Sequence, residues 1–303
     1  MSTVRISKIK LPKQDPSTGK DNPWRGDVHS SNETLYMPDP AEGKILIINT
    51  DEDRITGAVE GTGSNSIASV CQDRGLLFLT GSGDGEARVY KIGTGKPHLP
   101  LKFDFVPHNI SLDSDRDILL VSNREYKFFR YPERRDMNFP MIAGNVIYTK
   151  FDDLEDSFII LFQNPSRLMM IKSGEELKVT RDIEFGDEIV NSAVVCSVDQ
   201  RVVAGTESGK ILVSGLNGGS FTVAISFKEP VRKILFNPLV NHLYVIFRDS
   251  RQLAVVDLQN SRVREIEKCS SEISDIIFDE LHNKIYALLP SIPALEAYLD
   301  MGR

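Results

Sequence analysis

The sequence lacks the features of membrane and disulfide-stabilised proteins. No stretch approaches the 18 or so apolar residues that a spanning helix needs. The first ten residues alternate polar and apolar side chains, so we expect neither a signal peptide nor a membrane anchor. The cysteines Cys71, Cys196 and Cys269 lie far apart and form no CxxC pair, which argues against a disulfide scaffold and fits a reducing compartment. We therefore expect a soluble intracellular protein, cytoplasmic or nuclear.

The sequence is also poor in basic charge and in the motifs of common enzymes. Its 36 Lys and Arg against 43 Asp and Glu give a net charge of −7, whereas proteins that coat nucleic acid need a dominant positive field. No GxGxxG that opens a helix, GxxxxGK[ST] or GxSxG occurs. The five histidines are scattered, while metal sites need three or four convergent ligands. We expect no cofactor, no metal, no membrane partner and no direct binding to nucleic acid.

What the sequence does contain is a repeat. Its apolar runs are short, rich in Val, Ile, Leu, Phe and Tyr, and separated by Gly, Asp, Asn, Ser and Pro, which indicates β-strands and turns. One series of runs begins at residues 35, 76, 118, 158, 202, 243 and 285, and a second begins at 45, 87, 126, 168, 211, 253 and 295. Both series keep a period of about 42 residues, the size of one β-propeller blade.

The repeat predicts one all-β domain over residues 1–303, a seven-bladed β-propeller with four antiparallel strands (a to d, from the inside outward) in each blade. The seventh unit supplies three strands, and Thr3–Leu11 is a strand-like segment without a blade, so we expect this N-terminal strand to complete the last blade. We expect a loop on the top face at 12–25, and blades at 26–62, 63–104, 105–143, 144–186, 187–228, 229–269 and 270–303.

The second unit carries a recognisable motif. Leu76 to Lys96 places Ser82-Gly83-Asp84-Gly85 between two apolar runs and Tyr90-Lys91 at the end of the second run. This segment resembles the WD-repeat family, in which Tyr90 would take the Trp place and Lys91 the Asp place. The resemblance implies a propeller that binds other proteins. YVTN-like and lactonase-like propellers share the period.

The strand order assigns the loops to two faces. Loops d–a and b–c share the top face, and loops a–b and c–d share the bottom face. We predict a partner-binding site on the top face, where arginine would bind carboxylates or phosphates of an acidic or phosphorylated peptide and tryptophan would be an apolar anchor. The residues of this predicted site are Trp24, Arg25, Arg124, Arg167, Arg248 and Arg251.

The bottom face is predicted to be acidic, although Asp is also a common turn residue. Its predicted carboxylates are Asp51, Glu52, Asp53, Asp73, Asp113, Asp115, Asp117, Asp152, Asp153, Glu155, Asp156, Asp199, Asp279 and Glu280. Which face binds partners stays open at this stage.

The sequence thus favours a non-enzymatic scaffold that mediates protein–protein interactions within a multi-subunit complex. One alternative is a lactonase-like hydrolase or isomerase that acts on a small molecule with a divalent ion at the central channel. Its candidate ligands would be Asn145, Glu188, Asn191, Glu229 and Glu272. Another alternative is a propeller associated with nucleic acid in a larger assembly.

Overall fold

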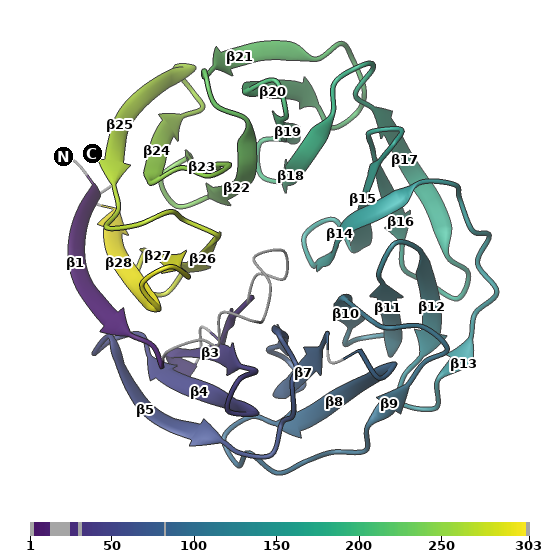
Figure 1. Cartoon of the computed structure of the whole chain (residues 1–303). Helices are drawn as coiled ribbons and strands as arrows, with labels where there is room; N and C mark the ends of the chain where they lie inside the picture. Colours follow the sequence, from purple (N-terminus) through teal and green to yellow (C-terminus); the bar gives the residue numbers. More distant parts are fainter. Residues whose placement is uncertain (1–2, 13–24, 30–31, 82, 301–303) are drawn as a thin grey trace.

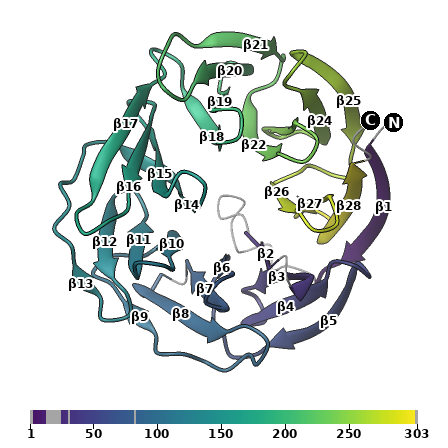
Figure 2. The ribbon, with the colours of Figure 1, turned by 180° about the vertical axis from the view of Figure 1, so that it is seen from behind.

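The computed structural model describes residues 3–12, 25–29, 32–81 and 83–300. Within them, 28 β-strands form seven four-stranded antiparallel sheets. The sheets are arranged as blades in a ring around a central axis, so the chain is a seven-bladed β-propeller, as the repeat predicts (Figure 1). Seen from the opposite side, the same inner strands surround the axis (Figure 2).

Each blade uses its strands in the order a, b, c, d from the axis outward. The inner strands a are β2 (Asp27–His29), β6 (Ile67–Cys71), β10 (Asn109–Asp113), β14 (Asn145–Asp152), β18 (Val190–Cys196), β22 (Val231–Asn237) and β26 (Asp275–Asp279). Strands b are β3 (Thr34–Asp39), β7 (Leu76–Thr80), β11 (Ile118–Ser122), β15 (Ser157–Gln163), β19 (Arg201–Thr206), β23 (His242–Phe247) and β27 (Lys284–Leu289). Strands c are β4 (Lys44–Asn49), β8 (Glu86–Lys91), β12 (Tyr126–Arg130), β16 (Arg167–Lys172), β20 (Lys210–Gly215), β24 (Gln252–Asp257) and β28 (Ala294–Asp300).

The outer strands d include one strand from the other end of the chain. Blades 1 to 6 use β5 (Arg54–Val59), β9 (Leu101–Lys102), β13 (Arg135–Asp136), β17 (Lys178–Glu184), β21 (Thr222–Ser226) and β25 (Arg262–Lys268). Blade 7 takes β1 (Thr3–Lys10), which pairs antiparallel with β28 from Thr3 opposite Asp300 to Lys10 opposite Ala294. The predicted closure by the N-terminal strand is confirmed.

The apolar runs form strands b and c because these strands lie between two neighbouring blades. Side chains on opposite faces of a strand alternate, so a strand that is covered on both sides needs apolar residues throughout. All five residues of β7 and all five of β11 are buried. The buried apolar residues form seven clusters, and each cluster fills one interface between adjacent blades.

The a–b turns explain part of the aspartate and asparagine pattern. The last turn residue before strand b has a left-handed φ of 50° to 57° in every blade, a conformation that Gly, Asn and Asp adopt more readily than other residues. These residues are Glu33, Gly75, Asp117, Asp156, Gln200, Asn241 and Asn283. Several residues that end strand a also accept hydrogen bonds from turn N–H groups, as Asp113 Oδ1 does from Asp115 at 3.0 Å. Much of the acidic pattern therefore serves turn geometry.

Candidate interaction surfaces

The predicted top-face residues do not form one cluster. Trp24 lies outside the described residues. Arg25 lies near the central axis, where its Nη1 donates to Asn109 Oδ1 at 2.8 Å and its Nε is 3.9 Å from Asp275 Oδ2. Asp275 also accepts a hydrogen bond from the Lys233 ammonium. Arg25 thus links blades 1, 3 and 7 around the axis.

Arg248 also takes part in contacts between blades. Its Nη1 and Nη2 donate to the two carboxylate oxygens of Glu207 in blade 5, at 2.6 and 2.7 Å. Glu207 in turn accepts from Asn191 Nδ2 at 2.7 Å, and the Asn191 amide also reaches the Val231 carbonyl at 2.8 Å. The bidentate geometry that we predicted for a partner carboxylate is therefore occupied by a carboxylate of this chain.

Arg167 and Arg251 are also held locally. The Arg167 side chain is largely buried, with its guanidinium 5.1 Å from the centre of the Phe162 ring and its Nε 3.7 Å from Asp182 Oδ1. Arg251 Nε donates to the Cys269 carbonyl at 3.3 Å. Because their guanidinium groups already contact other residues of this chain, Arg167 and Arg251 are less available to bind a ligand than their sequence positions predict.

Arg124 differs from the other predicted top-face arginines in the contacts of its guanidinium. It is exposed in the b–c turn of blade 3, and its guanidinium has no hydrogen bond or ion pair with another described residue. His108 lies near it: burial, followed by the charges of Arg25 and Arg124, lowers the pKa of His108. The structure brings Arg25, His108 and Arg124 together, whereas Arg167, Arg248 and Arg251 bind other residues.

The bottom face carries a feature that the sequence analysis missed. A large apolar side chain stands two residues after strand a in four consecutive blades, and all four are more than half exposed. They are Leu154 (76%), Val198 (75%), Leu239 (65%) and Leu281 (56%). We call them the apolar arc. The same positions in blades 2 and 3 are Asp73 and Asp115.

The sequence did contain a signal for the apolar arc. An apolar residue recurs with the period of the repeat inside turns that otherwise hold Asp, Asn, Pro and Ser. A search for apolar runs misses it because each residue stands alone. Exposed single apolar residues are common on protein surfaces, but an alignment of four on one face is not.

Carboxylates surround the apolar arc. Burial and then the neighbouring carboxylate of Asp73 raise the pKa of Asp153, against the opposing charge of Lys150. The arginines on the a–b turns of blades 2 and 3 are paired, since Arg74 contacts Asp117 at 2.5 Å and Arg116 contacts Asp156 at 2.6 Å, and the a–b turns that carry the arc contain no Lys or Arg. The bottom face around the arc therefore has an excess of negative charge.

Two of the five residues proposed for a metal-dependent hydrolase, Glu188 and Asn191, have other partners, whereas Glu229 Oε2 is buried and has no hydrogen-bond partner among the described residues. Glu188 accepts from Lys210 Nζ at 2.5 Å and from Ser208 at 2.7 Å, and Asn191 bonds Glu207 as above. Within the described ranges, no group of three or more His, Cys, Asp and Glu residues could hold a metal ion. No helix in the same ranges is long and apolar enough to cross a membrane.

Comparison with known proteins supports the fold and does not identify a family. No family model matches the sequence, and no curated protein sequence matches it. Hydrazine synthase of Kuenenia stuttgartiensis aligns with a TM-score of 0.78 and 10% identity, over 97% of this chain and 100% of that chain. The β-propeller domain of Myceliophteria thermophila Cps50 (Swd1) aligns with a TM-score of 0.77 and 8% identity, over 99% of this chain and 100% of that chain.

At such identities the likeness shows the fold alone. One of the two neighbours is named as an enzyme and the other as a propeller domain, so the fold does not decide between catalysis and binding. The solved structures support the propeller fold, and no family model supports the WD-repeat resemblance of blade 2.

Proposed function

We propose that this protein is a non-enzymatic scaffold for protein–protein interactions, and that its bottom face is the main binding surface. The observation that carries the proposal is the apolar arc, because four aligned apolar side chains exposed to water on one face of a rigid ring mark a contact surface. Burial of one leucine side chain in an interface stabilises a complex by about 1.5–3 kcal/mol.

The charge around the arc indicates the kind of partner. Asp73, Asp115, Asp153, Glu155 and Glu280 lie on the same a–b turns as the arc or on the adjacent ones. Charges at the rim of an interface select partners and speed association when the partner has the opposite sign. We therefore propose that the partner binds through a protein segment that carries apolar side chains flanked by Lys or Arg.

The test is affinity purification of the tagged protein from its native cell lysate, followed by mass spectrometry. The double variant Leu154→Asp/Leu239→Asp should lose stoichiometric partners, because it places two carboxylates where apolar contacts are needed. Both side chains are mostly exposed, so the variant should fold. The matched control Ile266→Asp changes a half-exposed apolar residue on the outer strand β25 and should keep the partners.

A second candidate surface lies on the top face, and the observation that supports it is the exposed guanidinium of Arg124. The predicted acidic or phosphorylated peptide could bind there, beside Arg25 and His108. Arg124→Glu in the same purification distinguishes the two surfaces. Loss of partners with Arg124→Glu alone would move the binding site to the top face, and an identical partner set for all variants would contradict the scaffold function.

A further inference from the structure

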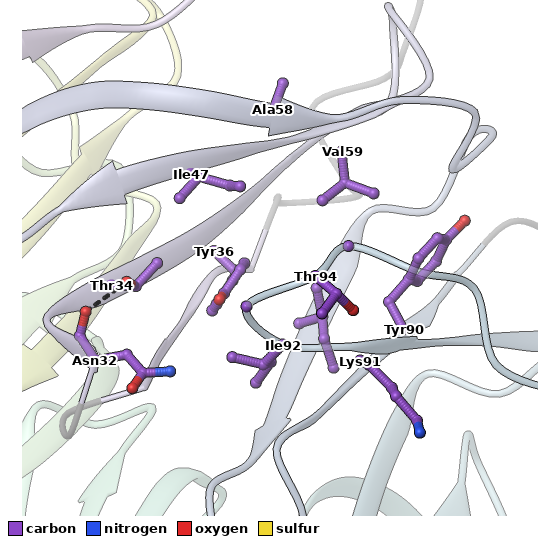
Figure 3. A pocket seen from close by; sticks show the side chains of 13 residues that line it. Asn32, Thr34, Tyr36, Ile47, Ala58, Val59, Tyr90, Lys91, Ile92 and Thr94 are labelled. Carbon is purple, nitrogen blue, oxygen red and sulfur yellow. Dashed lines mark hydrogen bonds between the residues drawn. The ribbon is translucent and has the colours of Figure 1, made fainter.

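A groove lies between blades 1 and 2, where the core is filled less completely than elsewhere. Among the described residues, this interface holds six buried apolar residues, whereas each of the other six interfaces holds ten to twelve. The groove has a volume of about 560 Å³, within the usual range for small-molecule sites. Figure 3 shows Tyr36 between Ile47 and Ile92, with Val59 and Thr94 nearby.

The repeat shows what the groove lacks. Tyr36, Tyr244 and Tyr286 occupy the same position in strand b of blades 1, 6 and 7, as their pairing with strands a and c shows. In blade 6, the Tyr244 hydroxyl donates to the Asp300 carboxylate of blade 7. In blade 7, the Tyr286 hydroxyl donates to Asp53 Oδ1 of blade 1 at 2.7 Å. Each of these hydroxyls therefore binds a carboxylate from the following blade.

A basic side chain joins the carboxylate in both cases. His242 Nδ1 lies 2.7 Å from Asp300 Oδ2, and Lys284 Nζ lies 3.3 Å from Asp53 Oδ1. In each of these two interfaces, the tyrosine hydroxyl and the basic side chain together bind one carboxylate. The arrangement is a small carboxylate site that is filled from within the chain.

Blade 2 supplies no carboxylate for Tyr36. The segment from Lys91, the last residue of β8, to Lys96 contains isoleucine, glycine and threonine and no Asp or Glu. The Tyr36 hydroxyl has no hydrogen-bond partner among the described residues, and burial raises its pKa. Lys91 is exposed at the edge of the groove and forms no ion pair in the described part of the chain.

We infer that the groove between blades 1 and 2 binds a small organic acid. The ligand's carboxylate would accept the hydrogen bond of the Tyr36 hydroxyl, and Lys91 would supply the positive charge. Ile47, Val59 and Ile92 would contact an apolar body of the ligand. This site is separate from the apolar arc, so it stands whether or not the scaffold function is correct.

Ligand-observed NMR titration tests the inference with 4-phenylbutyrate, a carboxylate with a compact apolar body. The uncharged analogue 4-phenylbutyramide is the matched ligand. We expect saturable binding of the acid and much weaker binding of the amide. Tyr36→Phe should weaken binding of the acid at least about tenfold, because hydrogen bonds to charged groups are strong.

Control variants separate binding from folding. Tyr36→Phe should leave the melting temperature unchanged, since its hydroxyl has no hydrogen-bond partner among the described residues, whereas Tyr286→Phe should lower the melting temperature and keep ligand binding. Lys91→Gln should weaken binding several-fold, whereas Lys172→Gln, at the end of strand c in blade 4, should not. No saturable binding, equal binding of acid and amide, or full affinity in Tyr36→Phe would overturn the inference.

Discussion

At the scale of single residues, Glu296 shows how a buried charge joins the two ends of the chain. Its side chain is 0% exposed on β28. Arg5 and Lys8 of β1 lie 3.2 and 3.6 Å from its Oε1, and Tyr298 and the Ser270 N–H donate to its Oε2 at 2.9 and 3.2 Å. Every oxygen of this carboxylate is therefore satisfied, which a buried charge requires.

The surroundings of Glu296 predict a pH-dependent stability. Burial alone would raise the pKa of Glu296, but hydrogen bonds from Ser270 and Tyr298 and the charge of Arg5 hold it below its ordinary value of 4.5. A carboxyl with a lowered folded-state pKa stabilises the fold above the unfolded-state pKa, and this stabilisation is lost as the pH falls through the folded-state value.

Glu296→Gln should destabilise the protein by about 2 kcal/mol at neutral pH, because an N–H group would face donors. Thermal melts of both proteins across the acid range check this. The difference between their melting temperatures should shrink below pH 4.5, the ordinary value of this carboxyl. A difference that stays constant or grows on acidification would contradict the assigned role of the carboxylate.

At the scale of elements, strand β1 closes the ring. It covers the edge of β28, which would otherwise be open to pairing with other chains. Ile9 of β1 is 5% exposed and belongs to the cluster between blades 7 and 1, whereas Ile6 of the same strand is 42% exposed. One strand thus offers a buried and an exposed isoleucine for comparison.

Ile9→Asp should cost about 3–5 kcal/mol of folding free energy, because it removes a packed side chain and buries a charge. Ile6→Asp should change stability by less than about 0.5 kcal/mol. Thermal or denaturant unfolding of the two variants measures both values. Equal effects of the two substitutions would mean that β1 is not packed as described.

The sequence was most informative where packing dictates composition. Strands b and c were predicted in every blade because both of their faces are buried. Outer strands were harder to predict: β9 and β13 have two residues each and are defined by pairing with strand c rather than by an apolar pattern. Blade 1 begins with a three-residue inner strand that the sequence indicates only weakly.

The candidate site was less predictable for a related reason. The period assigns Arg248 to the top face, but its partner Glu207 lies 41 residues earlier in the neighbouring blade. Which side chains meet across two blades depends on side-chain direction, which the period does not determine. Similarly, the Tyr36 hydroxyl, which has no hydrogen-bond partner in the described part of the chain, attracts notice only by comparison with the bonded hydroxyls of Tyr244 and Tyr286.

At the scale of the whole molecule, the propeller is a closed ring that presents loops on two faces of a fixed frame. On the top face, the positively charged side chains of Arg25 and Arg248 form hydrogen bonds with residues of neighbouring blades. The bottom face combines the apolar arc with the carboxylates of the a–b turns. This difference between the faces is the basis for assigning protein binding to the bottom face.

Hydrogen–deuterium exchange of the purified protein, alone and in complex with a co-purifying partner, tests that assignment most directly. The a–b turns at 153–156, 197–200, 238–241 and 280–283 should exchange more slowly in the complex, since a partner on the apolar arc would cover their backbone. The turns at 123–125 and 248–251 on the top face should be unchanged. Protection confined to the top face or to the outer strands would contradict the account.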